Sequence, residues 1–284
     1  MEEEVVIDTL DLKRDLKDAT RLYSAAFTDN PAYSYLFPNK AALPQALVWF
    51  FERRLRIIQE LGGMLWCARL RSSSSASSRL IGCVCACSPE AAKPPTWTMV
   101  RHGVLLWPVW WGLESLGRLQ SSLSAGSKLH HEAMLRIDPP LEHAAGTGSD
   151  STGGRWEIMM MAVDPAFQGR GIGTRLLRQA LACLAERFPA VAVTLTTQLP
   201  QNVPFYQKQG FICAPPAPST AAPSDSSRSE NVDDGGEKRG EAEDVSPPTL
   251  IMFEGTEHEY PDWLMYLRRA DDFVGTKGKE SKDV

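Results

Sequence analysis

The sequence lacks a long hydrophobic run. Its longest apolar stretch, residues 104–113, contains a proline and is about half the length that a helix needs to cross a bilayer. Residues 1–15 are acidic and lack the basic and then apolar layout of a secretory signal. We therefore expect no membrane partner, no export and a reducing compartment, the cytoplasm, with the nucleus as the alternative.

The sequence also has no excess of basic residues. Its formal net charge is −5 at pH 7, with 30 Lys and Arg against 35 Asp and Glu, whereas general nucleic acid binding depends on basic patches that neutralise phosphates. Eight acidic and three basic residues fall in residues 214–249, so this segment carries the whole net charge. We expect no nucleic acid partner.

Cysteine is present but not in metal-binding spacing. The six cysteines include no CxxC pair, and no histidine stands at zinc-ligand spacing from them. We expect free thiols and no metal. Cys83, Cys85 and Cys87 alternate, so a strand would place them on one face, where cysteine behaves as a small apolar residue.

Hydrophobic spacing predicts a single α+β domain over residues 1–270, with insertions. A strand-helix-strand-helix alternation over residues 155–211 is typical of a parallel β-α-β unit. The predicted helices cover residues 12–27, 42–61, 93–131, 171–188 and 203–209. The predicted strands cover residues 64–70, 80–87, 156–163, 191–197, 250–255 and 263–269.

Several segments are too polar to pack into that domain. Serine-rich residues 71–79 and glycine-rich residues 143–154 predict flexible loops. Residues 214–249 contain no aromatic residue and many Pro, Ser, Gly and acidic residues, which predicts a disordered acidic insert because too little apolar surface is available for burial. We expect residues 271–284 to be a disordered tail.

A glycine-rich turn is the main chemical motif. Residues 168–173 (QGRGIG) stand between the strand ending at Val163 and an amphipathic helix. Glycines there let several backbone N–H groups point at one spot, and the helix start adds partial positive charge, which favours a phosphate. The segment matches neither the GxxxxGK[ST] loop nor the GxGxxG dinucleotide fingerprint.

The remaining pattern, Q-x-x-G-x-G, resembles the acyl-CoA pyrophosphate loop of the GNAT superfamily of N-acetyltransferases. The AVDP turn before it and residues 202–211 (NVPFYQKQGF) resemble that family as well, the latter through a second motif of the form N-x-x-[FA]-Y-x-x-x-G-F. The resemblance covers roughly residues 1–213 and 250–270, but only residues 155–211 are specific.

The resemblance implies a GNAT fold, which is a central mixed, mostly antiparallel sheet flanked by helices with a parallel β-α-β cofactor unit. It also implies acetyl-CoA as co-substrate. The strand edge would pair with the pantetheine arm, the glycine turn would hold the pyrophosphate, and an asparagine would bond backbone or the cofactor arm. The implied cofactor residues are Met161, Ala162, Val163, Gln168, Gly169, Arg170, Gly171, Ile172, Gly173, Thr174 and Asn202.

Two catalytic residues follow from the resemblance. Tyr206 would protonate the departing thiolate, and the alternative is a packing tyrosine. Glu157 is the candidate base that deprotonates the acceptor ammonium, and the alternative is a chain of water molecules. Strand alternation would place Glu157 on one face with Met159, Met161 and Val163, which would raise the pKa of the carboxyl. A backbone N–H near Ala162 or Val163 would polarise the thioester carbonyl.

The acceptor side is less defined. Residues 27–37 resemble a segment that borders the acceptor cleft in a fungal and bacterial GNAT subgroup, or they form a turn with an aromatic anchor. The tryptophan-rich block of residues 97–111 is either core or the other wall of that cleft, which would make the acceptor site apolar with few charges.

We therefore predict an enzyme that transfers acetyl from acetyl-CoA to a primary amine of a small molecule, by direct attack in a ternary complex, as a monomer or homodimer. Two alternatives stay open. One is a protein or peptide lysine or N-terminal acetyltransferase, which needs an open acidic groove. The other is a non-catalytic acyl-CoA-binding module.

Overall fold

The computed structural model describes residues 3–72, 78–137, 155–189, 191–215, 249–252 and 259–270. The predicted loop at 143–154, the predicted tail at 271–284 and residues 216–248 of the predicted insert lie outside these ranges. The predicted loop at 71–79 is too long, because residues 71–72 and 78–79 belong to strands and extend a hairpin.

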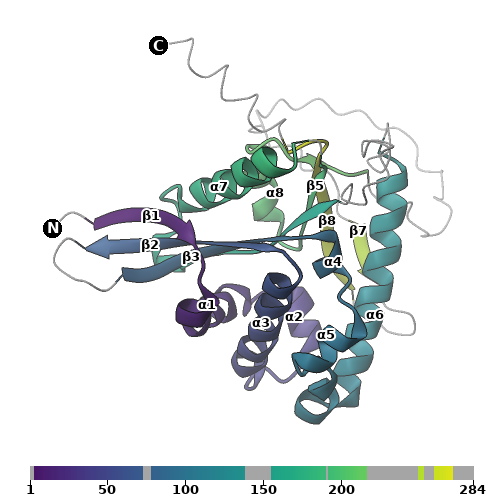
Figure 1. Ribbon diagram of the computed structural model, residues 1–284. Helices are drawn as coiled ribbons and strands as arrows, with labels where there is room; N and C mark the ends of the chain where they lie inside the picture. The colour runs from purple at the N-terminus through teal and green to yellow at the C-terminus, as the bar shows by residue number, and fades with distance from the viewer. Residues whose placement is uncertain are drawn as a thin grey trace, which may run out of the picture.

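The molecule is built on a mixed sheet (Figure 1). The strand order is β1-β2-β3-β4-β5-β8-β6, and β7 pairs with β8 off this path. Among the described strands only β4 and β5 pair in parallel, so the predicted α+β class with a mostly antiparallel sheet is confirmed. The strands are β1 (Glu3–Thr9), β2 (Met64–Ser72), β3 (Ser78–Cys87), β4 (Trp156–Val163), β5 (Val193–Thr197), β6 (Ile212–Cys213), β7 (Thr249–Met252) and β8 (Glu259–Leu267).

Helices cover both faces of the sheet, with α7 and α8 on one face and α1, α2 and α3 on the other (Figure 1). The long helix α6 runs beside β7 and β8. The helices are α1 (Leu12–Phe27), α2 (Pro31–Leu36), α3 (Leu43–Glu60), α4 (Pro89–Ala92), α5 (Thr96–Arg101), α6 (Trp107–Leu135), α7 (Ile172–Arg187) and α8 (Val203–Gln207), with short 3-10 turns η1 (Val104–Leu106), η3 (Pro165–Phe167) and η4 (Pro200–Asn202).

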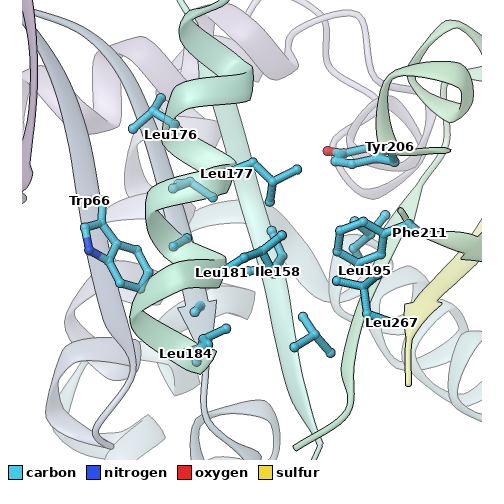
Figure 2. Packing of buried hydrophobic residues seen from close by; sticks show 14 of the residues in the cluster. Trp66, Ile158, Leu176, Leu177, Leu181, Leu184, Leu195, Tyr206, Phe211 and Leu267 are labelled. Atoms are coloured by element: carbon cyan, nitrogen blue, oxygen red, sulfur yellow. The ribbon is translucent and has the colours of Figure 1, made fainter. Parts of the chain in front are cut away.

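The core under α7 is apolar. Leu177, Leu181 and Leu184 recur at helical spacing and pack against Ile158 of β4 and Leu195 of β5 (Figure 2). Each of these leucines of α7 has no exposed surface, and full burial of such a side chain stabilises the fold by about 1.5–3 kcal/mol. This packing holds α7 on the parallel pair and so places the start of the helix beside β4.

The core under α1 and α3 contains polar groups as well. Cys83, Cys85 and Cys87 are buried together and free, so the prediction of an apolar thiol face is confirmed. Burial raises the pKa of each of these thiols, which leaves them protonated and unreactive. The carboxylate of Asp15 on α1 pairs with the guanidinium of Arg69 on β2, and both side chains are buried.

The tryptophan-rich block divides between interior and surface. Trp107 is buried and stacks on Phe37 with ring centroids 5.1 Å apart, so the core interpretation holds for it. Trp97 and Trp110 are 57% and 60% exposed. Gly112 interrupts α6 with φ 81° and ψ 164°, which bends the helix just beyond this block. In the described part of the chain, no helix has the length and hydropathy of a membrane span.

Candidate active site

The two parallel strands of the sheet separate at one end. β4 pairs with β5 only through residues 156–158, opposite residues 193–195. Beyond this point β5 continues along β8 and β4 continues along β3. Among the described residues no strand pairs with residues 159–163 of β4 on the β5 side, so that edge of β4 is open to an extended ligand with amide groups.

A β-bulge lies on β4 at this point. Met160 has φ 48°, the one described non-glycine residue with positive φ, and the register against β3 shifts at the same place. The extra residue reverses the alternation of side chains. Glu157 and Met159 face the side of α1 and α3, whereas Met161 and Val163 pack with α7. The prediction that all four share one face is therefore wrong.

The glycine turn follows β4 immediately and leads into α7. Gly169 and Gly171 have φ 73° and 72°, a conformation that residues with a Cβ rarely adopt. Within the described residues, no backbone hydrogen bond uses the N–H groups of Gly169 to Thr174, and the first such donor is Arg175, bonded to Gly171 O at 3.0 Å. No described side chain caps α7. The turn thus presents several free donors and a helix start, and a diphosphate fits this set.

Other residues of the turn support its shape. Gln168 Nε2 donates to Val163 O at 3.1 Å, which ties the turn to the strand. The Arg170 guanidinium lies over the ring of Phe167, 5.1 Å from its centroid. A Cβ at Gly173 would meet Met161 Cε, the end of a flexible side chain, at 2.9 Å, so the start of α7 lies close to the Met161 side chain of β4.

The remaining predicted cofactor residues differ in burial and in their hydrogen-bond partners. The side chains of Ala162 and Ile172 are buried in the two cores, so only their backbone groups can meet a ligand. Thr174 lies in the first turn of α7. Asn202 Nδ2 donates to Thr197 Oγ1 at 3.1 Å and thereby fixes the start of α8 against the end of β5.

Tyr206 lies on α8 at the edge of the α7 core. It is 9% exposed, and its ring contacts Phe205 and Phe211 edge-on. Figure 2 shows its hydroxyl pointing toward α7, on the side where Leu177 lies. The hydroxyl makes no hydrogen bond within the described residues and is not among the fully buried polar atoms. Burial raises the pKa of Tyr206 to about 12, so the hydroxyl keeps its proton at neutral pH.

Glu157 is half-buried on the opposite face of β4. Burial raises the pKa of its carboxyl above the ordinary value, while the nearby charges of Arg54, His130 and Arg155 act to lower it and that of Asp262 to raise it. A carboxylate with a raised pKa is better matched to accepting a proton near neutral pH. Four ionisable groups therefore gather around Glu157 on this face of the sheet, whereas the sequence led us to expect an acceptor site with few charges.

Four polar residues that sequence reasoning missed also belong to this side: Arg54, His130, Gln198 and Asp262. Arg54 Nη2 lies 3.3 Å from Met159 Sδ on β4. None of the four stands in a motif. Only the folded chain brings Arg54, His130 and Asp262 near Glu157, and Gln198 joins them through its bond to Asp262. Asn30, from the predicted acceptor-side segment, caps α2 through Ala32 N–H and donates to Gln198 Oε1 at 3.1 Å.

Comparison with known proteins gives a family for part of the chain. A family model described as the acetyltransferase (GNAT) domain matches residues 136–213, which include β4, the glycine turn, α7, β5 and α8. A search of curated proteins returns no match to the chain.

Solved structures of acetyltransferases resemble the chain at low identity. A structure described as histone acetyltransferase HPA2 and related acetyltransferase from Corynebacterium glutamicum is 14% identical, with a TM-score of 0.48 and coverage of 92% of this chain and 94% of that chain. NAA60 of Arabidopsis thaliana in complex with acetyl-CoA is 12% identical, with a TM-score of 0.43 and coverage of 93% and 98%. A GNAT family acetyltransferase from Brucella melitensis in complex with acetyl-CoA is 14% identical, with a TM-score of 0.37 and coverage of 74% and 83%.

Proposed function

We propose that this chain, whose residues 136–213 belong to the GNAT acetyltransferase superfamily, transfers acetyl from acetyl-CoA to a primary amine of a small molecule. The observation that carries the proposal is the combination of an open β4 edge with the free amides at the start of α7. These two features match the two chemically different parts of coenzyme A, its amide-containing arm and its diphosphate.

The co-substrate supplies an activated acetyl thioester. Backbone groups of residues 161–163 would bind the pantetheine arm in the manner of an added strand. The N–H groups of residues 168–174 would hold the diphosphate, assisted by the positive end of α7. The bulge at Met160 supports a backbone N–H of this segment as the donor that polarises the thioester carbonyl.

Transfer proceeds by direct attack in a ternary complex. Glu157 takes a proton from the acceptor ammonium, and the free amine attacks the thioester carbonyl. A C–N bond forms, the C–S bond breaks, and the thiolate takes a proton from the Tyr206 hydroxyl. The acylated nitrogen loses its second proton, which returns through water to the Tyr206 oxygen, so the product is a neutral amide and the tyrosine is restored. The raised pKa values of both groups support these roles, because Glu157 gains basicity and Tyr206 stays protonated.

The enclosure of Glu157 supports a small acceptor. Arg54 on α3 and His130 on α6 both interact with the carboxylate, so helices flank it on two sides. A small amine needs less free space beside the carboxyl than a protein chain, which needs an open groove.

Replacing Gly171 with valine tests the cofactor assignment. Valine cannot adopt φ 72° without strain, so the turn should rearrange and lose its charged hydrogen bonds to the diphosphate. We expect acetyl-CoA affinity to fall by about 100-fold or more, measured by calorimetry. Gly117→Ala is the matched control, because Gly117 lies in α6 and a methyl group added there would meet no atom within 4 Å.

An unchanged affinity in Gly171→Val, with the fold intact by circular dichroism, would refute the cofactor site. Acetyl-CoA consumption with polyamines, amino acids, aminonucleosides, arylalkylamines and peptides then identifies the acceptor class. Turnover with peptides alone would replace the small-molecule proposal, and binding without turnover on any amine would indicate a non-catalytic module.

A further inference from the structure

A series of hydrogen bonds runs along the face of the sheet opposite α7 and ends at His130. His130 Nε2 on α6 lies 2.5 Å from Asp262 Oδ2 on β8. Asp262 is 3% exposed and His130 is 31% exposed, so the carboxylate is shielded while the imidazole faces solvent in part. The pair joins α6 to β8 across 132 residues of sequence, and α6 packs along β7, the neighbour of β8 (Figure 1).

The partners of Asn30 and Gln198 determine which atom donates in each hydrogen bond of this series. The backbone N–H of Ala32 donates to Asn30 Oδ1 at 3.0 Å, so the amide nitrogen of Asn30 is the group that faces Gln198. Gln198 accepts with Oε1, and its Nε2 donates to Asp262 Oδ1 at 2.7 Å. An amide that accepts through oxygen and donates through nitrogen cannot reverse either bond without losing both.

This order defines the tautomer of His130. An ionised Asp262 accepts at both oxygens, from Gln198 and from His130. The proton of the neutral imidazole is therefore on Nε2, and Nδ1 carries the free lone pair. Nδ1 has no protein partner within the described residues. A buried carboxylate that fixes one nitrogen of a histidine and leaves the other available is the arrangement of an oriented base.

The surrounding charges fit that role. Burial of the imidazole lowers the pKa of His130, but the hydrogen bond to Asp262 and its charge, together with Glu157, raise the pKa above its ordinary value despite Arg155. Arg155 lies just before β4, Glu157 lies on β4 and Asp262 on β8. β7, which also packs along α6, has no ionisable residue. His130 in turn acts on the carboxyl of Glu157, so the two groups belong to one charged cluster.

The packing of α6 holds the histidine in place. Met134, one turn beyond His130, and Ile137, just after the end of α6, are buried with Ala192 and Tyr266. This contact anchors the end of α6 on the β5 and β8 side of the sheet, so His130 meets Asp262 without depending on the exposed half of the helix.

We propose that His130, oriented by Asp262, is the second proton acceptor of the transfer reaction. The proposal rests on the proposed function. Glu157 takes one proton from the acceptor ammonium and becomes neutral. That proton passes through water to His130 Nδ1, which regenerates the Glu157 carboxylate, and the imidazolium then releases the proton to solvent. Asn30 and Gln198 act as positioning residues, because they hold Asp262 and do not touch the proton.

The test uses three variants of the full chain: His130→Ala, Asp262→Asn and His131→Ala. His131 is the exposed neighbour on the same helix and makes no hydrogen bond or ion pair with the part of the chain that the structure describes, so it serves as the matched control. Acetyl-CoA affinity is measured by calorimetry, and kcat/KM is measured against pH with an amine that the wild-type chain acetylates.

We expect His130→Ala to bind acetyl-CoA as the wild-type chain does and to lose about 10- to 100-fold in kcat/KM at neutral pH, since general base catalysis contributes on this scale or above it. Added imidazole should restore part of the rate in this variant and in neither of the others. Asp262→Asn should shift the acidic limb of the pH profile to lower pH, because the group that raises the pKa of His130 is removed.

A wild-type rate in His130→Ala, or a reduced rate that imidazole does not restore, would overturn the role of His130 and leave the proposed function standing. A wild-type chain that binds acetyl-CoA but acetylates no amine would overturn both. If His130→Ala fails to fold, Asp262→Asn decides the question, and an unshifted pH profile in that variant refutes the proposal.

Discussion

The two faces of the sheet are built by different means. The face under α7 positions its ligand groups with backbone: an open strand edge, a bulge, two glycines with positive φ and unpaired N–H groups. The opposite face positions its groups with side chains from α1, α3, α6, β2, β4 and β8 and from Gln198, just after β5. In the proposed function, cofactor binding thus depends on a local backbone conformation, whereas acceptor chemistry depends on tertiary contacts.

Removing the charge of Glu157 should have the largest effect on activity. The effect should be confined to acceptor chemistry and should leave cofactor binding unchanged. We expect Glu157→Gln to lower kcat/KM by about 100-fold to 10,000-fold, because the base of the reaction is lost, with acetyl-CoA affinity unchanged by calorimetry. Glu186→Gln, an exposed substitution on α7, is the control. Weakened acetyl-CoA binding in Glu157→Gln would show that the two faces are not independent.

Breaking the buried ion pair between Asp15 and Arg69 should destabilise the folded protein on the face under α1 and α3. Asp15→Asn leaves the Arg69 guanidinium buried without a counter-charge, so we expect the free energy of unfolding to fall by about 3–5 kcal/mol in urea titration. Asp18→Asn, exposed on the same helix, should change it by less than about 0.5 kcal/mol.

The same pair predicts a pH dependence of stability. Burial acts to raise the pKa of Asp15, but the hydrogen bonds from Arg14 and Asp11 and the charges of Arg69 and Arg14 outweigh it and lower the pKa. The folded state therefore binds this proton less readily than the unfolded state, and the stabilisation is complete above the unfolded pKa and is lost as pH falls through the folded pKa. Equal acid sensitivity of wild type and Asp15→Asn would contradict this.

Tyr206→Phe should have an intermediate effect on turnover and tests the face of the sheet under α7. The ring contacts with Phe205 and Phe211 remain, so acetyl-CoA affinity should stay within about twofold. Loss of the proton donor should lower kcat by about 10- to 100-fold in steady-state assays. A wild-type kcat would assign Tyr206 to packing, which was the alternative interpretation of this residue.

The smallest effect is expected from Arg54→Gln. The positive charge of Arg54 lowers the pKa of Glu157, so its removal should raise that pKa further and move the acidic limb of kcat/KM to higher pH by a few tenths of a unit to about one unit. Arg56→Gln, which removes an exposed pair with Glu52 on the same helix, should leave the limb in place. A shift in the opposite direction would exclude Glu157 as the titrating base.

The face under α7 could be predicted from the sequence because the residues that form β4, the glycine turn and α7 follow one another directly in the chain. The predicted strand at 156–163 matches β4, and the predicted helix at 171–188 differs from α7 by one residue at each end. Glycine spacing and hydrophobic periodicity are local signals, and so they report local structure. The bulge at Met160 was missed, because nothing in a run of three methionines marks the residue that takes positive φ.

The opposite face, under α1 and α3, could not be predicted in the same way. His130 and Asp262 stand 132 residues apart and follow no motif, so the sequence offers no sign that they meet. β1 was missed as well, because its acidic start resembles a solvated terminus, although its residues pair with β2 along the whole strand. Such pairings are decided by the tertiary fold and are weakly encoded in any short window.

The bond from Asn30 to Gln198 spans 168 residues, and this has a consequence for how the protein folds. Long loops must close before such a contact can form, and contacts of this separation slow folding. The turn of the cofactor site is tied by Gln168 to Val163, only five residues away. During synthesis we therefore expect the cofactor site to form first, and the acceptor side to become complete only after β8, with Asp262, has joined the sheet.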